Sequence, residues 1–250
     1  FASIWIFTLR LPWELGADFF LRHLLDGDAA ANTLSWRWVA GLQTPGKTYA
    51  ARASNIAKYT EGRFRPQGLE PSPVPLDGTP HPPKGDAPVS DALDPDLPTG
   101  FLLHEDDLSP GFALDRVTPT ATFVLKATAA RSPLEVAPIV HDFVDGALDD
   151  CLARFKDRLG PVTVSADGAA ITDWAAKHGC RQIVLAYPPT GPIADRMGAA
   201  QPALENAGLP LVRLIRPYDA LAWPHATAGF FKFKAKIPHL ISDLNLRPAA

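Results

Sequence analysis

Cysteine is scarce in this sequence, which has only Cys151 and Cys180 among its 250 residues. The two lie far apart, and neither belongs to a C-x-x-C motif or to a Cys/His pair. The spacing typical of a zinc site or of a disulfide framework is therefore missing. We expect no metal site and two buried thiols in a reducing compartment.

Long apolar runs and methionine are also scarce. No run of about eighteen apolar residues occurs, so we expect no membrane helix, and the start FASIWIFTLRLPW is too interrupted for a signal peptide. Met197 is the only methionine, and a chain that opens on Phe1 is interpreted as a fragment. We expect a cytoplasmic monomer without a membrane partner.

Common catalytic motifs are absent as well. The sequence has no G-x-S-x-G, H-E-x-x-H or G-x-G-x-x-G, which excludes the simplest hydrolase and dinucleotide-binding hypotheses. The run His104-Glu105-Asp106-Asp107 offers oxygen ligands for a hard cation, but consecutive side chains point in different directions. We interpret this run as a solvated acidic turn.

Proline and charge divide the chain into three parts. Ten prolines fall between Pro66 and Pro98, a composition that disfavours helix and sheet and indicates a linker or an extended covering arm. Residues 1–66 carry eight Lys/Arg against five Asp/Glu, whereas residues 67–116 carry two against ten. We predict a helical piece at 1–66 suited to a polyanion, an acidic proline-rich linker at 67–116 and a third piece at 117–250.

The two outer parts differ in their periodicity. ELGADFFLRHLL, AAANTLSWRWVAGL and TYAARASNIAKY predict three helices, with Asp28 as the N-cap of the second. After the linker, apolar runs at 121–127, 181–187 and 209–215 alternate with helical stretches, one of them at about 137–155. The fold class is thus α+β by segments: an all-α piece, then an α/β domain with a mainly parallel sheet. Ligands gather at the carboxyl ends of such strands, which here indicates the loop 188–191.

The stretch GLQTPGKT at 41–48 fits the phosphate-loop pattern G-x-x-x-x-G-K-[ST]. A working phosphate loop follows a buried strand and offers successive backbone N–H groups to the anion, whereas this one follows a predicted helix and contains Pro45, which has no N–H. We interpret it as the loop that leaves the second helix, with Lys47 as a candidate contact for a phosphate of DNA.

Four of the six tryptophans lie within the first 38 residues. Asn32 and Trp36 are four positions apart and share one face of the second helix, whereas Trp38 faces elsewhere. Large aromatics at helical spacing usually fill a core.

The order D-G-D-x-x-x-N-x-x-x-W-x-W, formed by Asp26, Asp28, Asn32, Trp36 and Trp38, resembles the flavin-binding signature of the DNA photolyase and cryptochrome family. The preceding ADFFLRHLLDGD and the upstream Trp13 are similar to the family as well. Downstream, TYAARASN and GRFRP resemble its closing segment. The resemblance covers about residues 1–66, the last third of a flavin domain.

The resemblance implies an FAD cofactor and roles for single residues. Asp26 and Asp28 would line the adenine and ribityl side of FAD, and Asn32 would place its amide beside the reactive flavin nitrogen. Trp36 and then Trp13 would carry electrons, and a third tryptophan of the family is missing here.

The family also implies damaged DNA as the partner. In its repair members a lesion is flipped out of the duplex into a pocket, and Trp38 matches the position that stacks on it. Lys47 and Arg52 would contact phosphates of the DNA. The expected function is that of a deoxyribodipyrimidine photolyase, a lyase that repairs pyrimidine lesions with light. The alternative is a blue-light sensor of the cryptochrome type, and a third reading is a scaffold that has lost its flavin.

The chain departs from the family pattern in several places. Asn55-Ile56 stands where the family usually has Asn-Pro, one additional residue separates Tyr49 from Arg52, and the upstream part of the flavin pocket is missing. The third piece, 117–250, is distantly similar to the family's α/β antenna domain, although that domain normally precedes the flavin domain.

Overall fold

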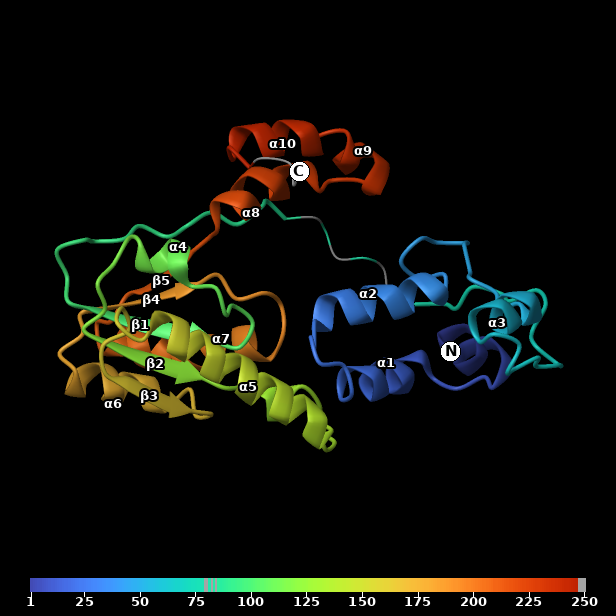
Figure 1. Ribbon diagram of the computed structural model, residues 1–250, viewed down its shortest axis with the longest axis horizontal. Helices are drawn as coiled ribbons and strands as arrows, with labels where there is room; N and C mark the ends of the chain where they lie inside the picture. Colours follow the sequence, from blue (N-terminus) through green and yellow to red (C-terminus); the bar gives the residue numbers. More distant parts are fainter. Residues whose placement is uncertain (79–80, 82, 84, 247–250) are drawn as a thin grey trace. The chain divides into compact units, whose positions relative to one another are not determined.

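The computed structural model describes residues 1–78, 81, 83 and 85–246 and divides into two compact units. The helical unit comprises residues 1–82 and 128–145, and the α/β unit comprises residues 83–127 and 146–250 (Figure 1). The boundary at 145 falls inside a helix that begins in one unit and ends in the other. The predicted combination of helices with a parallel sheet is confirmed.

The helical unit is built from short helices around an aromatic core. Its elements are the π-helical turn η1 (Ile4–Thr8), α1 (Trp13–Leu21), α2 (Ala29–Val39), α3 (Ala53–Tyr59), the 3-10 turn η2 (Thr128–Ala130) and the first half of α5 (Pro138–Phe155). The buried core residues of its first part are Ile6, Phe7, Ala17, Trp36, Ala40 and Leu42. The three helices predicted in this region are confirmed.

The α/β unit contains a five-stranded parallel sheet in the order β3-β2-β1-β4-β5. The strands are β1 (Thr99–His104), β2 (Ala121–Leu125), β3 (Val162–Ser165), β4 (Gln182–Ala186) and β5 (Leu211–Leu214). The helices of this unit are the second half of α5, α4 (Gly111–Leu114), α6 (Ala170–Lys177), α7 (Pro192–Asn206), α8 (Pro217–Ala222), α9 (Phe230–Lys234) and α10 (Ile237–Asp243), with the 3-10 turn η3 (Trp223–His225).

The inner strands of this sheet are buried along their whole length, as is typical of parallel sheets. Residues of α6 and α7, including Trp174 and Met197, pack on them in one apolar cluster. Burial raises the pKa of both thiols, Cys151 and Cys180, and thus keeps them protonated. The prediction that the two cysteines are free and buried is confirmed.

Strands β1 and β3 were not predicted from the sequence. β1 lies within residues 67–116, the range predicted to be a linker, where a short apolar run is surrounded by proline and acidic residues. Its last residue, His104, is 1% exposed and its Nε2 lies 3.0 Å from the carbonyl oxygen of Ala186. The interpretation of 104–107 as a solvated turn is therefore wrong for His104.

Described parts of the proline-rich segment form hydrogen bonds in each of the two units. In the helical unit, the N–H of Leu76 donates to the carbonyl of Ala40 at 3.0 Å. In the α/β unit, the N–H of Asp91 donates to the carbonyl of Arg213 at 2.9 Å and the N–H of Arg213 donates to the carboxylate of Asp91 at 2.8 Å. The hydroxyl of Ser90 accepts from the N–H of Ile215. Because β5 is an edge strand, these bonds satisfy backbone groups that would otherwise be unpaired.

Candidate functional site

The turn between α1 and α2 presents Asp26 and Asp28. Gly27 between them has φ +55°, a left-handed conformation that glycine adopts without steric cost. The carboxylate of Asp28 accepts from the N–H of Ala31 at 2.8 Å, so the predicted N-cap of α2 is confirmed. Both carboxylates are solvent-exposed.

Helices α1 and α2 are held together by the residues that follow this turn. The side-chain Nδ2 of Asn32 donates to the carbonyl of Ala17 at 2.8 Å, and Asn32 is buried. One turn later Trp36, 3% exposed, lies over Gly16 so closely that a Cβ there would be 2.3 Å from its Cη2. The predicted shared face of Asn32 and Trp36 thus points into the unit.

One pocket of the helical unit brings four of the predicted residues together. Its volume is about 330 Å³, and Asp26, Asp28, Asn32 and Trp36 all line it. The remaining lining residues are mainly apolar: Ala2, Phe20, Leu24, Ala31, Ser35 and Val39. A flat ring bound here would meet an amide, an indole and two carboxylates, and the rest of its surroundings would be hydrocarbon.

Trp36 is surrounded by further aromatic rings. Phe20 and Trp5 meet it edge-on, with centroids at 5.2 and 6.5 Å and interplanar angles of 86° and 87°. Trp13 is instead covered by the guanidinium of Arg37, 5.7 Å from its ring centroid. Among the ring pairs of the described residues, the indole adjacent to Trp36 is Trp5, which the family signature does not contain.

Trp38 lies on the surface, away from that pocket. It is 47% exposed and its ring is 5.3 Å from that of Tyr49. Tyr49 and Arg52 line a second, largely apolar pocket of about 620 Å³, which includes Asn55 and Phe64 but neither Trp38 nor Lys47.

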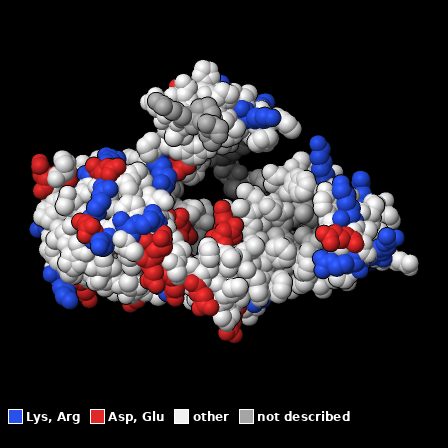
Figure 2. All heavy atoms as spheres, viewed as in Figure 1, with Lys and Arg blue, Asp and Glu red and all other residues white. Residues whose placement is uncertain are grey.

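Basic side chains gather over α3. Figure 2 shows Lys and Arg side chains over α3 and the residues next to it. The exposed ones on and beside this helix are Arg52, Lys58, Arg63 and Arg65, and Lys47 is also exposed. Neither Lys47 nor Arg52 makes an ion pair within the part of the chain that the structure describes. Both cations are therefore open to solvent.

Arg131 supports the DGD turn, and sequence analysis missed it. It is 9% exposed, its Nη1 donates to the carbonyl of Leu24 at 3.1 Å, and its guanidinium lies where a Cβ on Gly27 would be. Arg131 follows the turn by more than a hundred residues, so no local pattern could have connected the two.

The GLQTPGKT stretch forms the turn after α2, as predicted. It follows a helix and not a strand, which is not the context of a phosphate loop. In the described residues, no three His, Cys, Asp or Glu side chains are grouped closely enough to bind a metal ion. No helix in that part of the chain has both the length and the apolar character needed to span a bilayer.

Comparison with known proteins finds similarities to the first part of the helical unit. The family model for the FAD binding domain of DNA photolyase matches residues 1–68. Deoxyribodipyrimidine photo-lyase of Streptomyces griseus is 51% identical over 43 residues, which is 17% of this chain and 10% of that protein. The same-named protein of Salmonella typhimurium is 40% identical over 48 residues, or 19% of this chain and 10% of the relative. The chain thus spans about a tenth of each relative, and no solved structure matches it significantly.

Proposed function

We propose that this protein is part of a photolyase-like flavoprotein, because the family model for the FAD binding domain of DNA photolyase matches residues 1–68 and photo-lyases are similar to this segment. Its activity would be the repair of pyrimidine lesions in DNA by light-driven electron transfer from FAD. The observation that carries the proposal is the pocket shared by Asp26, Asp28, Asn32 and Trp36. The likeness of 117–250 to an antenna domain stays a prediction, because the family model ends at residue 68.

The residues of this pocket fit one part of FAD. A volume of about 330 Å³ is at the low end of the range for small-molecule sites, about 300–1,000 Å³, so the remainder of the cofactor needs contacts outside it. Asn32 donates to Ala17, which holds the amide in place and leaves its oxygen to accept from a ring N–H. Asp26 and Asp28 offer acceptors for hydroxyl and amino groups at the exposed rim.

Trp36 would form one wall of the flavin site and pass an electron inward. When bound, FAD supplies the light-absorbing ring that gives up an electron to the lesion. Trp5, edge-on to Trp36 at 6.5 Å, is the structurally adjacent donor, and Trp13 is the donor that the family resemblance implies. To distinguish these two donors, light-driven reduction of bound FAD is compared in the Trp5→Phe and Trp13→Phe variants.

Trp38 and Tyr49 would receive the lesion. An exposed indole beside a second ring offers a face on which a flipped base can stack, worth about 1–3 kcal/mol per base, and Lys47 and Arg52 would contact the phosphates. This aromatic face favours repair over light sensing.

The test combines FAD with a DNA oligonucleotide that contains one ultraviolet pyrimidine dimer. We expect FAD to bind the purified full-length flavoprotein of which this chain would be a part, Asn32→Ala to weaken that binding and the exposed Thr33→Ala to leave it unchanged, measured by flavin fluorescence. Trp38→Ala should weaken binding of the damaged oligonucleotide about tenfold, which corresponds to one lost stack. Leu34→Ala, an exposed apolar change on the same helix, is the control. A full-length protein that binds no FAD would contradict the flavoprotein proposal, and equal DNA binding by Trp38→Ala and Leu34→Ala would contradict the role of Trp38.

A further inference from the structure

A segment from later in the chain contacts the turn between α1 and α2. Residues 128–145 belong to the helical unit, although the strands β1 and β2 precede them. Nη1 of Arg22 donates to the carbonyl of Glu135 at 3.2 Å, and the N–H of Ala137 donates to the carbonyl of Arg22 at 3.0 Å. Two hydrogen bonds therefore join the end of α1 to the stretch that leads into α5.

Arg131 of the same segment reaches the wall of the candidate flavin pocket. Its Nη1 donates to the carbonyl of Leu24 at 3.1 Å, and Leu24 lines that pocket. Its guanidinium occupies the space that a Cβ on Gly27 would need. Gly27 separates Asp26 from Asp28, and both of these residues line the pocket. Arg131 thus holds the chain on either side of Asp26.

The side chain of Arg131 lies in a buried position. It is 9% exposed, and Thr128 and Ser132 of the same segment are also buried. A charged donor is costly to bury unless it is hydrogen-bonded, so the bond to the carbonyl of Leu24 restrains both partners. At Gly27 the φ of +55° disfavours a side chain, and the guanidinium leaves no space for one. We therefore expect the turn to keep this conformation as long as Arg131 is in place.

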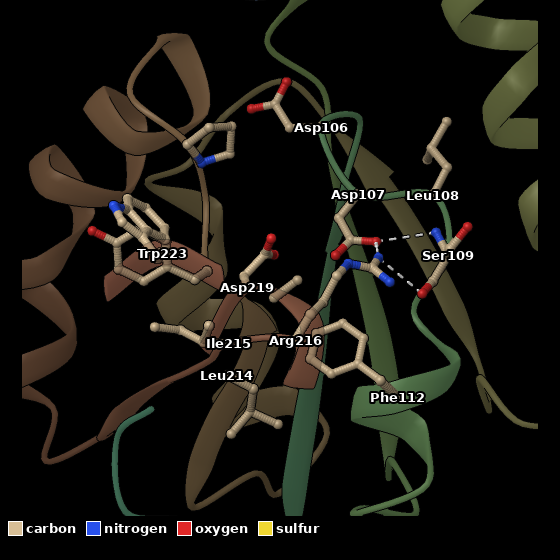
Figure 3. A pocket seen from close by; sticks show the side chains of 13 residues that line it. Asp106, Asp107, Leu108, Ser109, Phe112, Leu214, Ile215, Arg216, Asp219 and Trp223 are labelled. Atoms are coloured by element: carbon tan, nitrogen blue, oxygen red, sulfur yellow. Dashed lines mark hydrogen bonds and ion pairs between the residues drawn. The ribbon is translucent and has the colours of Figure 1, made fainter. Parts of the chain in front are cut away.

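A second arginine joins distant parts of the α/β unit in a similar way. Arg216 forms an ion pair with Asp107 and donates to the carbonyl of Ser109 at 3.0 Å, in each case across more than a hundred residues of sequence. Figure 3 shows Arg216 beside Asp107 and Ser109, with which it lines a pocket of about 460 Å³ that also includes Pro189 of the loop 188–191. Because Arg216 belongs to the other unit, it provides a matched control for Arg131.

We propose that Arg131 is a positioning residue of the flavin site. It holds the turn 24–28 so that Asp26 and Asp28 line the pocket, and it acts on the cofactor through these two carboxylates. The inference rests on the proposed function, because it assigns Arg131 to the same site. FAD binding by residues 1–68 then depends on a segment that the family model does not cover.

The first test measures FAD affinity by flavin fluorescence in the full-length flavoprotein of which this chain would be a part. We expect Arg131→Met, which keeps an apolar stem but has no donor, to weaken FAD binding about tenfold, because the two carboxylates are then no longer held toward the pocket. Arg131→Lys keeps the charge and a donor and should retain more of the affinity. Arg216→Met should leave FAD binding unchanged. Circular dichroism shows whether each variant is folded.

A double variant separates positioning from a general loss of stability. Asp26→Ala and Arg131→Met should each weaken FAD binding, and the double variant should weaken it by less than the product of the two single effects, because Arg131 acts through Asp26. A further readout needs no cofactor. In the protein without FAD, Arg131→Met should accelerate hydrogen exchange at the amide of Ala31, which donates to the carboxylate of Asp28.

The outcomes distinguish this inference from the proposed function. If the native protein and Arg131→Met bind FAD equally well, the inference is overturned and the proposed function stands. Effects of Arg131→Met and Asp26→Ala that multiply fully, an unchanged exchange rate at Ala31, or an equal loss of FAD affinity in Arg216→Met would also overturn it. A native protein that binds no FAD would instead contradict the proposed function, and this inference with it.

Discussion

At the scale of single residues, Gly16 determines how closely the helical unit can pack. Its missing side chain leaves the space that the indole of Trp36 fills, with Cη2 2.3 Å from the position of a Cβ. The same close approach brings Asn32 to the carbonyl of Ala17. A small residue in α1 therefore positions both the amide and the indole of the candidate flavin pocket.

We predict that Gly16→Ala destabilises the protein. Overpacking costs about 1–3 kcal/mol. The better helix propensity of alanine offsets about 1 kcal/mol of this cost, so the free energy of unfolding should fall by up to about 2 kcal/mol. Urea unfolding followed by circular dichroism and tryptophan fluorescence measures it. The control is Gly198→Ala in α7, where a Cβ meets open space and alanine should stabilise by up to about 1 kcal/mol. Equal stability of the two variants would show that Trp36 moves aside freely.

Part of the site could be predicted residue by residue. The cap by Asp28 and the shared face of Asn32 and Trp36 follow from local spacing and agree with the structure. Gly16, Trp5 and Arg131 could not be predicted, because their roles arise from contacts with other segments. Arg131, for example, donates to the carbonyl of Leu24, which lies more than a hundred residues earlier in the sequence.

At the scale of elements, the sheet edge at β5 is completed by an irregular segment. Asp91 bonds to Arg213 through both its backbone and its carboxylate, and the two side chains form an ion pair at 3.7 Å. Since the proline-rich composition removes N–H donors, this segment can cover an edge without extending the sheet. Helices α1, α2, α3 and α5 and the strands β2, β4 and β5 followed from periodicity, whereas β1, which is surrounded by proline and acidic residues, and the exposed β3 lack such a signal.

We predict that Asp91→Ala loosens the edge at β5. Loss of the carboxylate leaves the N–H of Arg213 without that acceptor and should cost about 0.5–1.5 kcal/mol, the contribution of an ordinary hydrogen bond. The ion pair between Asp91 and Arg213 contributes little to the free energy of unfolding, because both side chains are partly exposed. Hydrogen exchange at the amide of Arg213 should accelerate, with Asp86→Ala, an exposed carboxylate of the same segment, as the control. An unchanged exchange rate would mean that the backbone bond from Asp91 to the carbonyl of Arg213 holds the segment without the carboxylate.

At the scale of the whole molecule, residues far apart in sequence form each unit. Residues 128–145 belong to the helical unit although β1 and β2 precede them. The bonds from Arg22 to Glu135 and from Ala137 to Arg22 join this segment to α1. Composition could predict a helical part and an α/β part, but no periodicity indicates that a later segment returns to the first unit.

Charge is distributed unevenly over the molecule, and this leads to a prediction about DNA. The net charge is −3, yet residues 1–66 carry an excess of Lys and Arg, so a polyanion should bind only there. Binding of the dimer-containing duplex should weaken as salt increases, because each neutralised phosphate contributes about 0.9 to the slope of log K against log salt concentration. We expect Lys47→Ala and Arg52→Ala each to reduce that slope by about one. Lys177→Ala in α6, an exposed charge of the α/β unit, should leave it unchanged. If the Lys177 variant lowered the slope as much as the other two, the contact surface for DNA would extend to the α/β unit.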